Sequence, residues 1–166
     1  MEIYSFPPIT SPTAKILILG SMPGKASLAA NQYYAHPRNL FWPIMGELIG
    51  AYPQLEYLRR IRILQDNDIA LWDVLKSCRR TSSLDADIEK SSMIVNDFSG
   101  FFAGHCQIRR VFFNGATAEQ AFRKHVLPVI NTEFLQLQRL PSSSPAHAAM
   151  SFQEKLQIWR NVIGKC

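Results

Sequence analysis

The chain has 166 residues, which is the size of one globular domain, and its composition excludes several classes of protein. Hydrophobic residues make up 47% and charged residues 19%, so the chain can bury an apolar core and is not expected to be disordered. No apolar stretch approaches the roughly 18 residues of a membrane-spanning helix, and the first residues lack the pattern of a secretory signal. Three scattered cysteines form neither a disulfide framework nor a metal-binding motif, which favours a reducing cytoplasm.

The charge balance of the chain is basic. Eighteen Lys and Arg residues against 13 Asp and Glu residues give a formal net charge of +5. Basic proteins attract polyanions, and nucleic acids are the commonest of these. Part of the charge is clustered in arginine pairs, such as Arg79-Arg80 and Arg109-Arg110. Because such pairs are also frequent on ordinary solvated surfaces, the charge permits nucleic-acid binding without establishing it.

Four short apolar runs have the length and composition of β-strands. They cover residues 15–19, 69–74, 108–113 and 134–140. The first three are almost uniformly hydrophobic, as expected of parallel strands that are covered on both faces. The fourth alternates between apolar and polar residues, which is typical of a half-exposed edge strand.

Helical patterns separate and follow these runs: one begins after Asn39, and others cover 54–65, 97–103, 118–125 and 151–163. The last pattern has the clearest start, because Ser151 and Glu154 have the spacing of a capping box. Strands that alternate with helices predict a parallel sheet with right-handed crossovers. We therefore expect an α/β fold, a three-layer αβα sandwich with a central four-stranded, mainly parallel sheet, as a single domain over residues 1–166.

Small and polar residues follow three of the four predicted strands, at the sheet edge where open α/β domains bind ligands. They form the segments GSMPG at 20–24, NG at 114–115 and PSSSP at 141–145. Ordinary strand-to-helix turns have a similar composition, but three such loops at one edge favour a binding site. The first is not a phosphate-binding loop, because its glycines are too close together and Ala26 replaces the hydroxyl residue.

The segment YYAHPRNLFW at 33–42 places several aromatic residues where a loop is expected. Trp42 fits the first turn of a helix and should pack inward, whereas Tyr33 and Tyr34 have no evident core to enter. Aromatic rings beside basic and amide groups suit stacking on a nucleobase, which contributes roughly 1–3 kcal/mol per base.

In combination, four motifs resemble those of the uracil-DNA glycosylase superfamily, and within it the hypoxanthine (deoxyinosine) DNA glycosylase branch. They are GSMPG at 20–24, YYAHPRNLFW at 33–42, FNG at 113–115 and LPSSSPAH at 140–147. The resemblance implies a monofunctional DNA glycosylase that flips deaminated bases, hypoxanthine above all, and hydrolyses their N-glycosidic bond in base excision repair. It implies double-stranded DNA as the partner and leaves single-stranded DNA open. We expect a monomer that uses no cofactor and no metal.

The resemblance also assigns a catalytic residue. Met22 occupies the position in the first loop where mismatch-specific relatives carry a polar residue, and a thioether orients water poorly. In the hypoxanthine branch the catalytic Asn lies in the second motif and matches Asn39, whose carbonyl is expected to orient the attacking water. Asn39 also fits the cap of the helix that follows it, and the two roles are compatible.

Further site residues follow from the same resemblance. His147 is a candidate to assist the leaving group, although a histidine in a loop is more often simply at the surface. The residues expected to contact the base are Ser21, Met22, Tyr34, which would stack on it, and Asn114, which would read its edge. Those expected to contact DNA are Lys25, Ser142, Ser143 and Ser144.

The sequence leaves three alternative functions open. A uracil or mismatch-specific glycosylase fits Asn114 equally well, because uracil offers O4 and N3–H where hypoxanthine offers O6 and N1–H. A catalytically silent, damage-binding homologue fits the thioether at Met22. A small-molecule hydrolase that uses the serine loop is disfavoured, since no G-x-S-x-G motif is present. The sequence indicates no role for the cysteines or for residues 82–85.

Overall fold

A four-stranded parallel sheet forms the centre of the computed structural model, which describes residues 1–164. In spatial order its strands are β3 (Ile69–Asp73), β2 (Ile16–Gly20), β6 (Arg110–Asn114) and β7 (Gln136–Leu140). Every neighbouring pair is parallel, so all four carboxyl ends lie at the same edge. Each residue of β2 and β3 is buried, whereas the edge strand β7 is largely exposed, with only Leu140 fully buried, as expected of a half-exposed edge strand.

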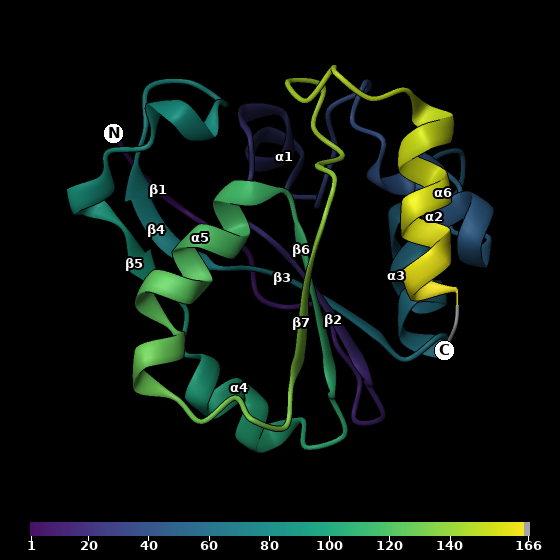
Figure 1. Ribbon diagram of the computed structural model, residues 1–166. Coiled ribbons are helices and arrows are strands. Elements are labelled where there is room, and N and C mark those ends of the chain that lie inside the picture. The colour runs from purple at the N-terminus through teal and green to yellow at the C-terminus, as the bar shows by residue number, and fades with distance from the viewer. Residues whose placement is uncertain (165–166) are drawn as a thin grey trace.

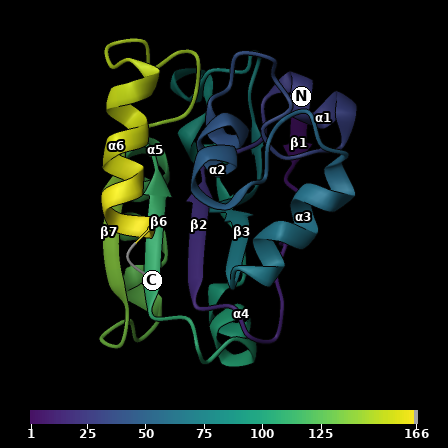
Figure 2. The ribbon, with the colours of Figure 1, turned by 90° about the vertical axis from the view of Figure 1, so that its right-hand side faces the viewer.

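Helices cover both faces of this sheet (Figures 1 and 2). One face carries α2 (Phe41–Ile49), α3 (Tyr57–Asp66) and α6 (Phe152–Ile163). The opposite face carries α4 (Phe98–Gly104) and α5 (Ala116–His125). Figure 2 looks onto the first of these faces, with the strands behind the helices. The predicted α/β class and its central four-stranded parallel sheet are confirmed.

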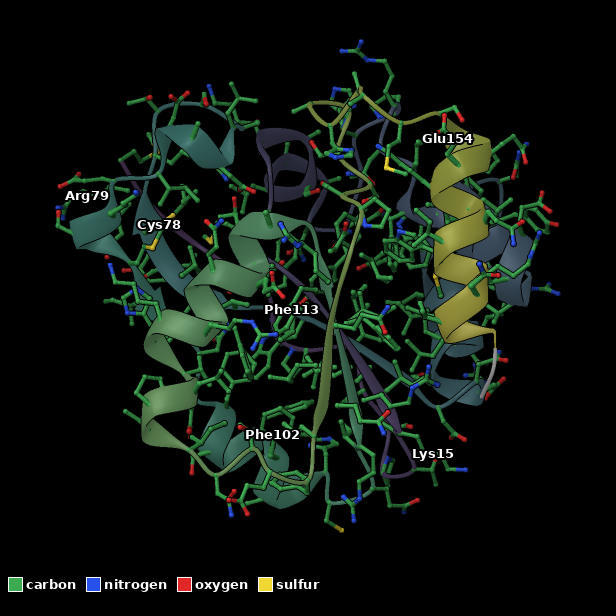
Figure 3. All side chains as sticks on the ribbon, in the orientation of Figure 1. Lys15, Cys78, Arg79, Phe102, Phe113 and Glu154 are labelled. Atoms are coloured by element: carbon green, nitrogen blue, oxygen red, sulfur yellow. The ribbon has the colours of Figure 1, made fainter. Side chains whose placement is uncertain are left out.

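Alternate residues of β2 supply the two hydrophobic cores. Leu17 and Leu19 face the core beneath α4 and α5, and Ile16 and Ile18 face the core beneath α2, α3 and α6. Figure 3 shows Phe102 and Phe113 on the side of the first core, to which both belong. The same view places Lys15, just before β2, at the opposite end of the molecule from Glu154.

A second sheet, which the sequence analysis did not predict, contributes Leu75 and Cys78 to the core beneath α4 and α5. It consists of β1 (Glu2–Tyr4), β4 (Leu75–Arg79) and β5 (Ile94–Val95), in the order β1-β4-β5 with antiparallel pairing. Only Val74 separates β3 from β4, so one extended run of sequence serves two sheets.

Several short elements complete the part of the chain that the structure describes: α1 (Lys25–Ala30) and the 3₁₀ turns η1 (Asp85–Asp87), η2 (Lys90–Ser92) and η3 (Leu127–Val129). None of these was predicted, because one or two turns are too short to show helical periodicity. Within residues 1–164, no helix has both the length and the apolar character needed to span a bilayer. Cys78 and Cys106 are free thiols, and Cys166 lies outside the described residues.

The start of α6 has the predicted capping box. The Ser151 hydroxyl accepts a hydrogen bond from the Glu154 N–H at 3.2 Å, and Glu154 Oε1 accepts one from the Ser151 N–H at 3.3 Å. Replacing Ser151 by Ala leaves the Glu154 N–H without this acceptor, which costs about 1 kcal/mol. We expect thermal denaturation to give a midpoint lower by roughly 2–4 °C for a domain of this size. The exposed Gln153→Ala is the control, and an unchanged midpoint in Ser151→Ala would show that the cap contributes nothing.

Candidate functional site

A cavity of about 700 Å³ opens at the carboxyl edge of the parallel sheet. This volume lies within the range of small-molecule binding sites and can hold a nucleobase with its sugar. The loops that follow β2, β6 and β7 line it, together with the segment before α2 and residues 83–86. All the site residues predicted from the sequence contribute to this one lining: Ser21, Met22, Lys25, Tyr34, Asn39, Asn114, Ser142, Ser143, Ser144 and His147.

Gly20 is the point at which the loop after β2 enters the cavity, and its lack of a side chain is required there. A Cβ atom on Gly20 would lie 2.6 Å from Asp73 Oδ1 and 2.7 Å from the Tyr34 hydroxyl oxygen, both too close for a real contact. The loop is fixed by two backbone hydrogen bonds, from Val74 N–H to the Gly20 carbonyl and from Leu75 N–H to the Ser21 carbonyl. These hydrogen bonds hold the start of the loop, which forms the floor of the cavity, against residues 74 and 75.

The two adjacent tyrosines have different environments. Tyr33 lines part of the cavity but is almost fully buried, and its hydroxyl donates to the Pro7 carbonyl at 3.0 Å, so Tyr34 is the better candidate to stack on a base. Tyr34 has a left-handed backbone (φ 54°) and lines the cavity. Phe41 stacks on the Tyr34 ring with a centroid distance of 4.3 Å, which leaves only the opposite ring face for a base.

Asn39 reaches the cavity from just before α2, and its carbonyl oxygen is already in use. Oδ1 accepts hydrogen bonds from the Phe41 N–H and from the Ser143 hydroxyl, both at 2.9 Å. The Phe41 N–H fixes the orientation of the amide, since a flipped amide would bring two donors together. Asn39 therefore satisfies the first turn of α2, as its position suggested. Oδ1 thus already accepts two hydrogen bonds in this structure, and the expectation that it orients the attacking water stays a prediction.

Ser143 is the centre of the hydrogen-bond network between the loops. Its hydroxyl accepts from Asn114 Nδ2 and donates to Asn39 Oδ1, both at 2.9 Å. Its N–H donates to Asn114 Oδ1 at 2.8 Å, and its carbonyl accepts from the Leu40 N–H at 2.9 Å. The residue is fully buried, at 0% exposure. Every polar group of Ser143 is therefore engaged inside the protein in this structure, and its predicted contact with a DNA phosphate stays a prediction.

The flanking serines are half-buried and stay candidates for DNA contact. Their hydroxyl oxygens accept hydrogen bonds from the backbone of the same loop: Ser142 from Ser144 N–H, and Ser144 from Ala146 N–H, each at 3.1 Å. A hydroxyl that accepts in this way can still donate its own proton to a phosphate oxygen. Lys25 is exposed at the start of α1 on the rim of the cavity.

Helix α6 holds the loop after β7 in place at two points. The buried Lys155 ammonium donates to the His147 carbonyl at 2.6 Å, and Trp159 Nε1 donates to the Pro141 carbonyl at 3.0 Å. His147 itself is half-buried, and within residues 1–164 its buried Nδ1 has no hydrogen-bond partner. The yellow chain above β7 in Figure 1 is this loop, and it turns directly into α6.

Ionisable residues that the sequence analysis missed form the floor of the cavity. Asp73 ends β3 and is 3% exposed, and burial, together with the charge of Asp85, raises the pKa of its carboxyl to about 7. Burial also raises the pKa of Asp85, which accepts a hydrogen bond from the Ser21 hydroxyl at 2.7 Å. Arg80 lies beneath and donates to the Pro23 carbonyl at 2.5 Å. A charged residue inside the apolar run IALWDVL at 69–75 is the signal that could have indicated Asp73.

Met22, on the other side of the floor, belongs to the core beneath α5 as well as to the cavity lining. Only 7% of Met22 is exposed. Within residues 1–164, no group of three or more His, Cys, Asp or Glu side chains is arranged to hold a metal ion.

The protein is an α/β domain with a parallel sheet, and its carboxyl-edge loops join two amide side chains beside one cavity, where domains of this class bind their ligands. The chain belongs to the uracil DNA glycosylase superfamily, whose family model matches residues 7–163. This finding confirms the resemblance that the motifs indicated.

Individual relatives agree with this assignment. The chain is 39% identical over 116 residues to a hypoxanthine DNA glycosylase of Methanosarcina barkeri. The aligned region covers 69% of this chain and 72% of the relative. The chain is 35% identical over 147 residues to a hypoxanthine DNA glycosylase of Methanosarcina acetivorans, with coverage of 88% and 89%. The fold is similar to the solution NMR structure of a candidate uracil DNA glycosylase from Methanosarcina acetivorans, with a TM-score of 0.81 and 33% sequence identity. The superposed region covers 98% of this chain and 97% of that chain.

Proposed function

We propose that this protein is a monofunctional DNA glycosylase that removes deaminated bases, hypoxanthine foremost, by hydrolysis of the N-glycosidic bond in base excision repair. The observation that carries the proposal is the cavity at the carboxyl edge of the sheet, in which Ser143 joins the amides of Asn39 and Asn114. Membership of the superfamily and the two hypoxanthine DNA glycosylases among its relatives support a deaminated base in DNA as the substrate.

Recognition of the base takes place inside the cavity. A base has to leave the duplex to reach it, which costs a few kcal/mol and costs least at a mismatch such as one that contains deoxyinosine. Asn114 uses one Nδ2–H and one Oδ1 lone pair on Ser143, which leaves a donor and an acceptor for O6 and N1–H of hypoxanthine. The free face of the Tyr34 ring provides the stacking surface. Ser21 and Met22 line the cavity beside the base.

Bond cleavage leaves an electron-poor deoxyribose that resembles an oxocarbenium ion, as in other glycoside hydrolyses. Such a centre reacts with a weak nucleophile, so a catalytic group gains more by placing a water molecule than by deprotonating it. In Asn39 the group left for this task is Nδ2–H₂, since Oδ1 is occupied by Phe41 and Ser143. Asn39 thus holds the water by donating to its oxygen. His147, on the loop after β7, donates to the substrate as the base leaves, a role supported by its position in the lining of the cavity.

Binding to DNA uses the rim of the cavity. Lys25 and the hydroxyls of Ser142 and Ser144 lie there, and the net charge of +5 adds a general attraction to phosphates. We propose that the protein acts as a monomer in the cytoplasm, on double-stranded DNA first and on single-stranded DNA as a second form of substrate.

One series of incubations tests this function. Duplexes that contain hypoxanthine, uracil, xanthine or thymine opposite each normal base are incubated with the protein, treated with alkali and run on a sequencing gel. We expect hypoxanthine to be released fastest. Faster release of uracil would favour the uracil or mismatch-specific alternative, and binding without release would favour a catalytically silent homologue. Borohydride should trap no covalent adduct, because lyase chemistry needs an activated amine.

A further inference from the structure

We infer that the carboxyl group of Asp73 is a catalytic hydrogen-bond donor to the everted base, a role that rests on the glycosylase activity proposed above. Asp73 is the last residue of β3 and pairs in register with Gly20 of β2, at the edge of the sheet where the cavity opens. It lines the cavity together with Tyr34 and Asn114. Its backbone carbonyl already accepts from Asn96 Nδ2 at 2.8 Å, so the side chain is the part left for function.

One oxygen of the Asp73 carboxyl group is buried without a hydrogen-bond partner in the described part of the chain. Among residues 1–164, Asp73 Oδ2 has no hydrogen-bond partner, and no ammonium or guanidinium nitrogen lies within 4.0 Å of this carboxyl. The Tyr34 hydroxyl lies close to Gly20, as Asp73 does, and near Asn114. In the described part of the chain it forms no hydrogen bond of regular geometry. Burying unpaired polar groups costs free energy, so two of them beside one cavity indicate partners that arrive with a ligand.

The surroundings of Asp73 favour its protonated form. The charged groups that face it are Asp85 of η1 and the guanidinium of Arg80, which follows β4, and the phenols of Tyr33 and Tyr34 lie on the segment before α2. Burial and the Asp85 carboxylate raise the pKa of Asp73 to about 7, and Arg80 opposes them only in part. Arg80 directs its bonded nitrogen at the Pro23 carbonyl. Near neutral pH a large share of the molecules therefore carries a neutral carboxyl group that can donate a hydrogen bond.

A donor at this place stabilises the leaving group. When the bond between C1′ and the base nitrogen breaks, its electron pair moves onto the base, and the negative charge spreads over the ring nitrogens and the carbonyl oxygen. A neutral carboxyl group held in a water-poor site stabilises such charge, whereas a carboxylate would repel it. The proton stays on Asp73 within the hydrogen bond. Water adds its oxygen to C1′ and loses a proton to solvent, and the released base takes up a proton from solvent, so the net reaction consumes one water molecule.

The test is a pH profile of the chemical step. Single-turnover rates of hypoxanthine release are measured from pH 5.5 to 9 with saturating protein, for the unmodified protein, Asp73→Asn and Asp73→Ala. The unmodified protein should lose activity above pH 7, by about tenfold for each pH unit, as the carboxyl ionises. Asp73→Asn keeps a donor at every pH, so its rate should stay within about tenfold of the unmodified rate at pH 6 and show no fall above pH 7. Asp73→Ala should be slower by about 100-fold.

Controls separate this role from a structural one. The exposed Asp66→Asn should keep the unmodified pH profile. Fluorescence anisotropy should give the same affinity for hypoxanthine-containing DNA in all variants, and circular dichroism checks folding at each pH. If Asp73→Ala does not fold, the loss of the falling limb in Asp73→Asn still decides the question.

The outcomes distinguish this inference from the proposed function. If the unmodified protein releases no base, the glycosylase proposal fails and the role of Asp73 fails with it. The glycosylase proposal stands but the role of Asp73 is refuted by either of two results. One is that Asp73→Ala releases hypoxanthine as fast as the unmodified protein, and the other is that the rate of Asp73→Asn still falls above pH 7. A rate of the unmodified protein that is constant from pH 7 to 9 refutes it as well.

Discussion

Replacing Asn39 by Ala is expected to slow the release of hypoxanthine by at least about 100-fold, because the water molecule that attacks the deoxyribose is no longer held in place. The fold should survive. The variant loses the hydrogen bond from Oδ1 to the Phe41 N–H, which costs about 1 kcal/mol, as the loss of a helix cap does. Single-turnover rates measure the first effect and thermal denaturation the second. Binding to hypoxanthine-containing DNA, measured by fluorescence anisotropy, should change little.

A second substitution at the same position identifies the atom that matters. Asn39→Asp retains an oxygen for the Phe41 N–H and for the Ser143 hydroxyl but has no Nδ2–H₂. If that nitrogen holds the water, Asn39→Asp should be about as slow as Asn39→Ala. A rate equal to or above that of the unmodified protein would show that an oxygen is the working group. The exposed Asn161→Ala is the matched control, and full base release by Asn39→Ala would refute a catalytic role for this residue altogether.

The central sheet could be predicted because its strands carry their signal locally. Ile69–Asp73 is buried throughout and uniformly apolar up to its last residue, and the mixture of polar and apolar residues in Gln136–Leu140 matches its position at the sheet edge. The second sheet has no comparable signal. Glu2–Tyr4 and Ile94–Val95 are too short to show a period, and Leu75–Arg79 follows the preceding strand after one residue. Its pairing depends on contacts between distant parts of the chain, which a local pattern does not contain.

The location of the site was predictable for a topological reason, whereas the roles of several side chains were not. Parallel strands bring the loops after Gly20, Asn114 and Leu140 to the same edge whatever their sequences. Which side chain enters the cavity depends on hydrogen bonds formed only after folding. Tyr33 and Tyr34 are neighbours with the same side chain and both line the cavity, yet Tyr33 is almost fully buried in the core and Tyr34 is only half-buried. No local feature distinguishes them before the backbone adopts its left-handed conformation at the second.

The role of Ser143, the middle serine of the PSSSP loop, also depends on hydrogen bonds that form only after folding. Its replacement should slow base release to an extent comparable with the replacement of Asn39. Ser143→Ala removes the hydroxyl that joins Asn39 to Asn114 and leaves both amides short of a partner in a buried place. A buried polar group without its hydrogen bond costs about 1–3 kcal/mol, which should appear as a lower free energy of unfolding in denaturant titrations. Because each amide loses one of the two hydrogen bonds that hold it, the single-turnover rate should fall by roughly 10- to 100-fold, whereas the affinity for DNA should be almost unchanged.

The neighbouring serines provide the comparison that isolates this effect. Ser142→Ala and Ser144→Ala each remove a hydroxyl from the same loop but leave the link between the two amides intact, so they should lower the affinity for DNA with little change in the rate of the bound complex. If Ser143 acts through Asn39, adding Ser143→Ala to Asn39→Ala should slow base release far less than Ser143→Ala does alone, because contacting residues are not additive. Fully additive effects, or a Ser143→Ala variant as fast as Ser144→Ala, would mean that the two amides hold their positions without this serine.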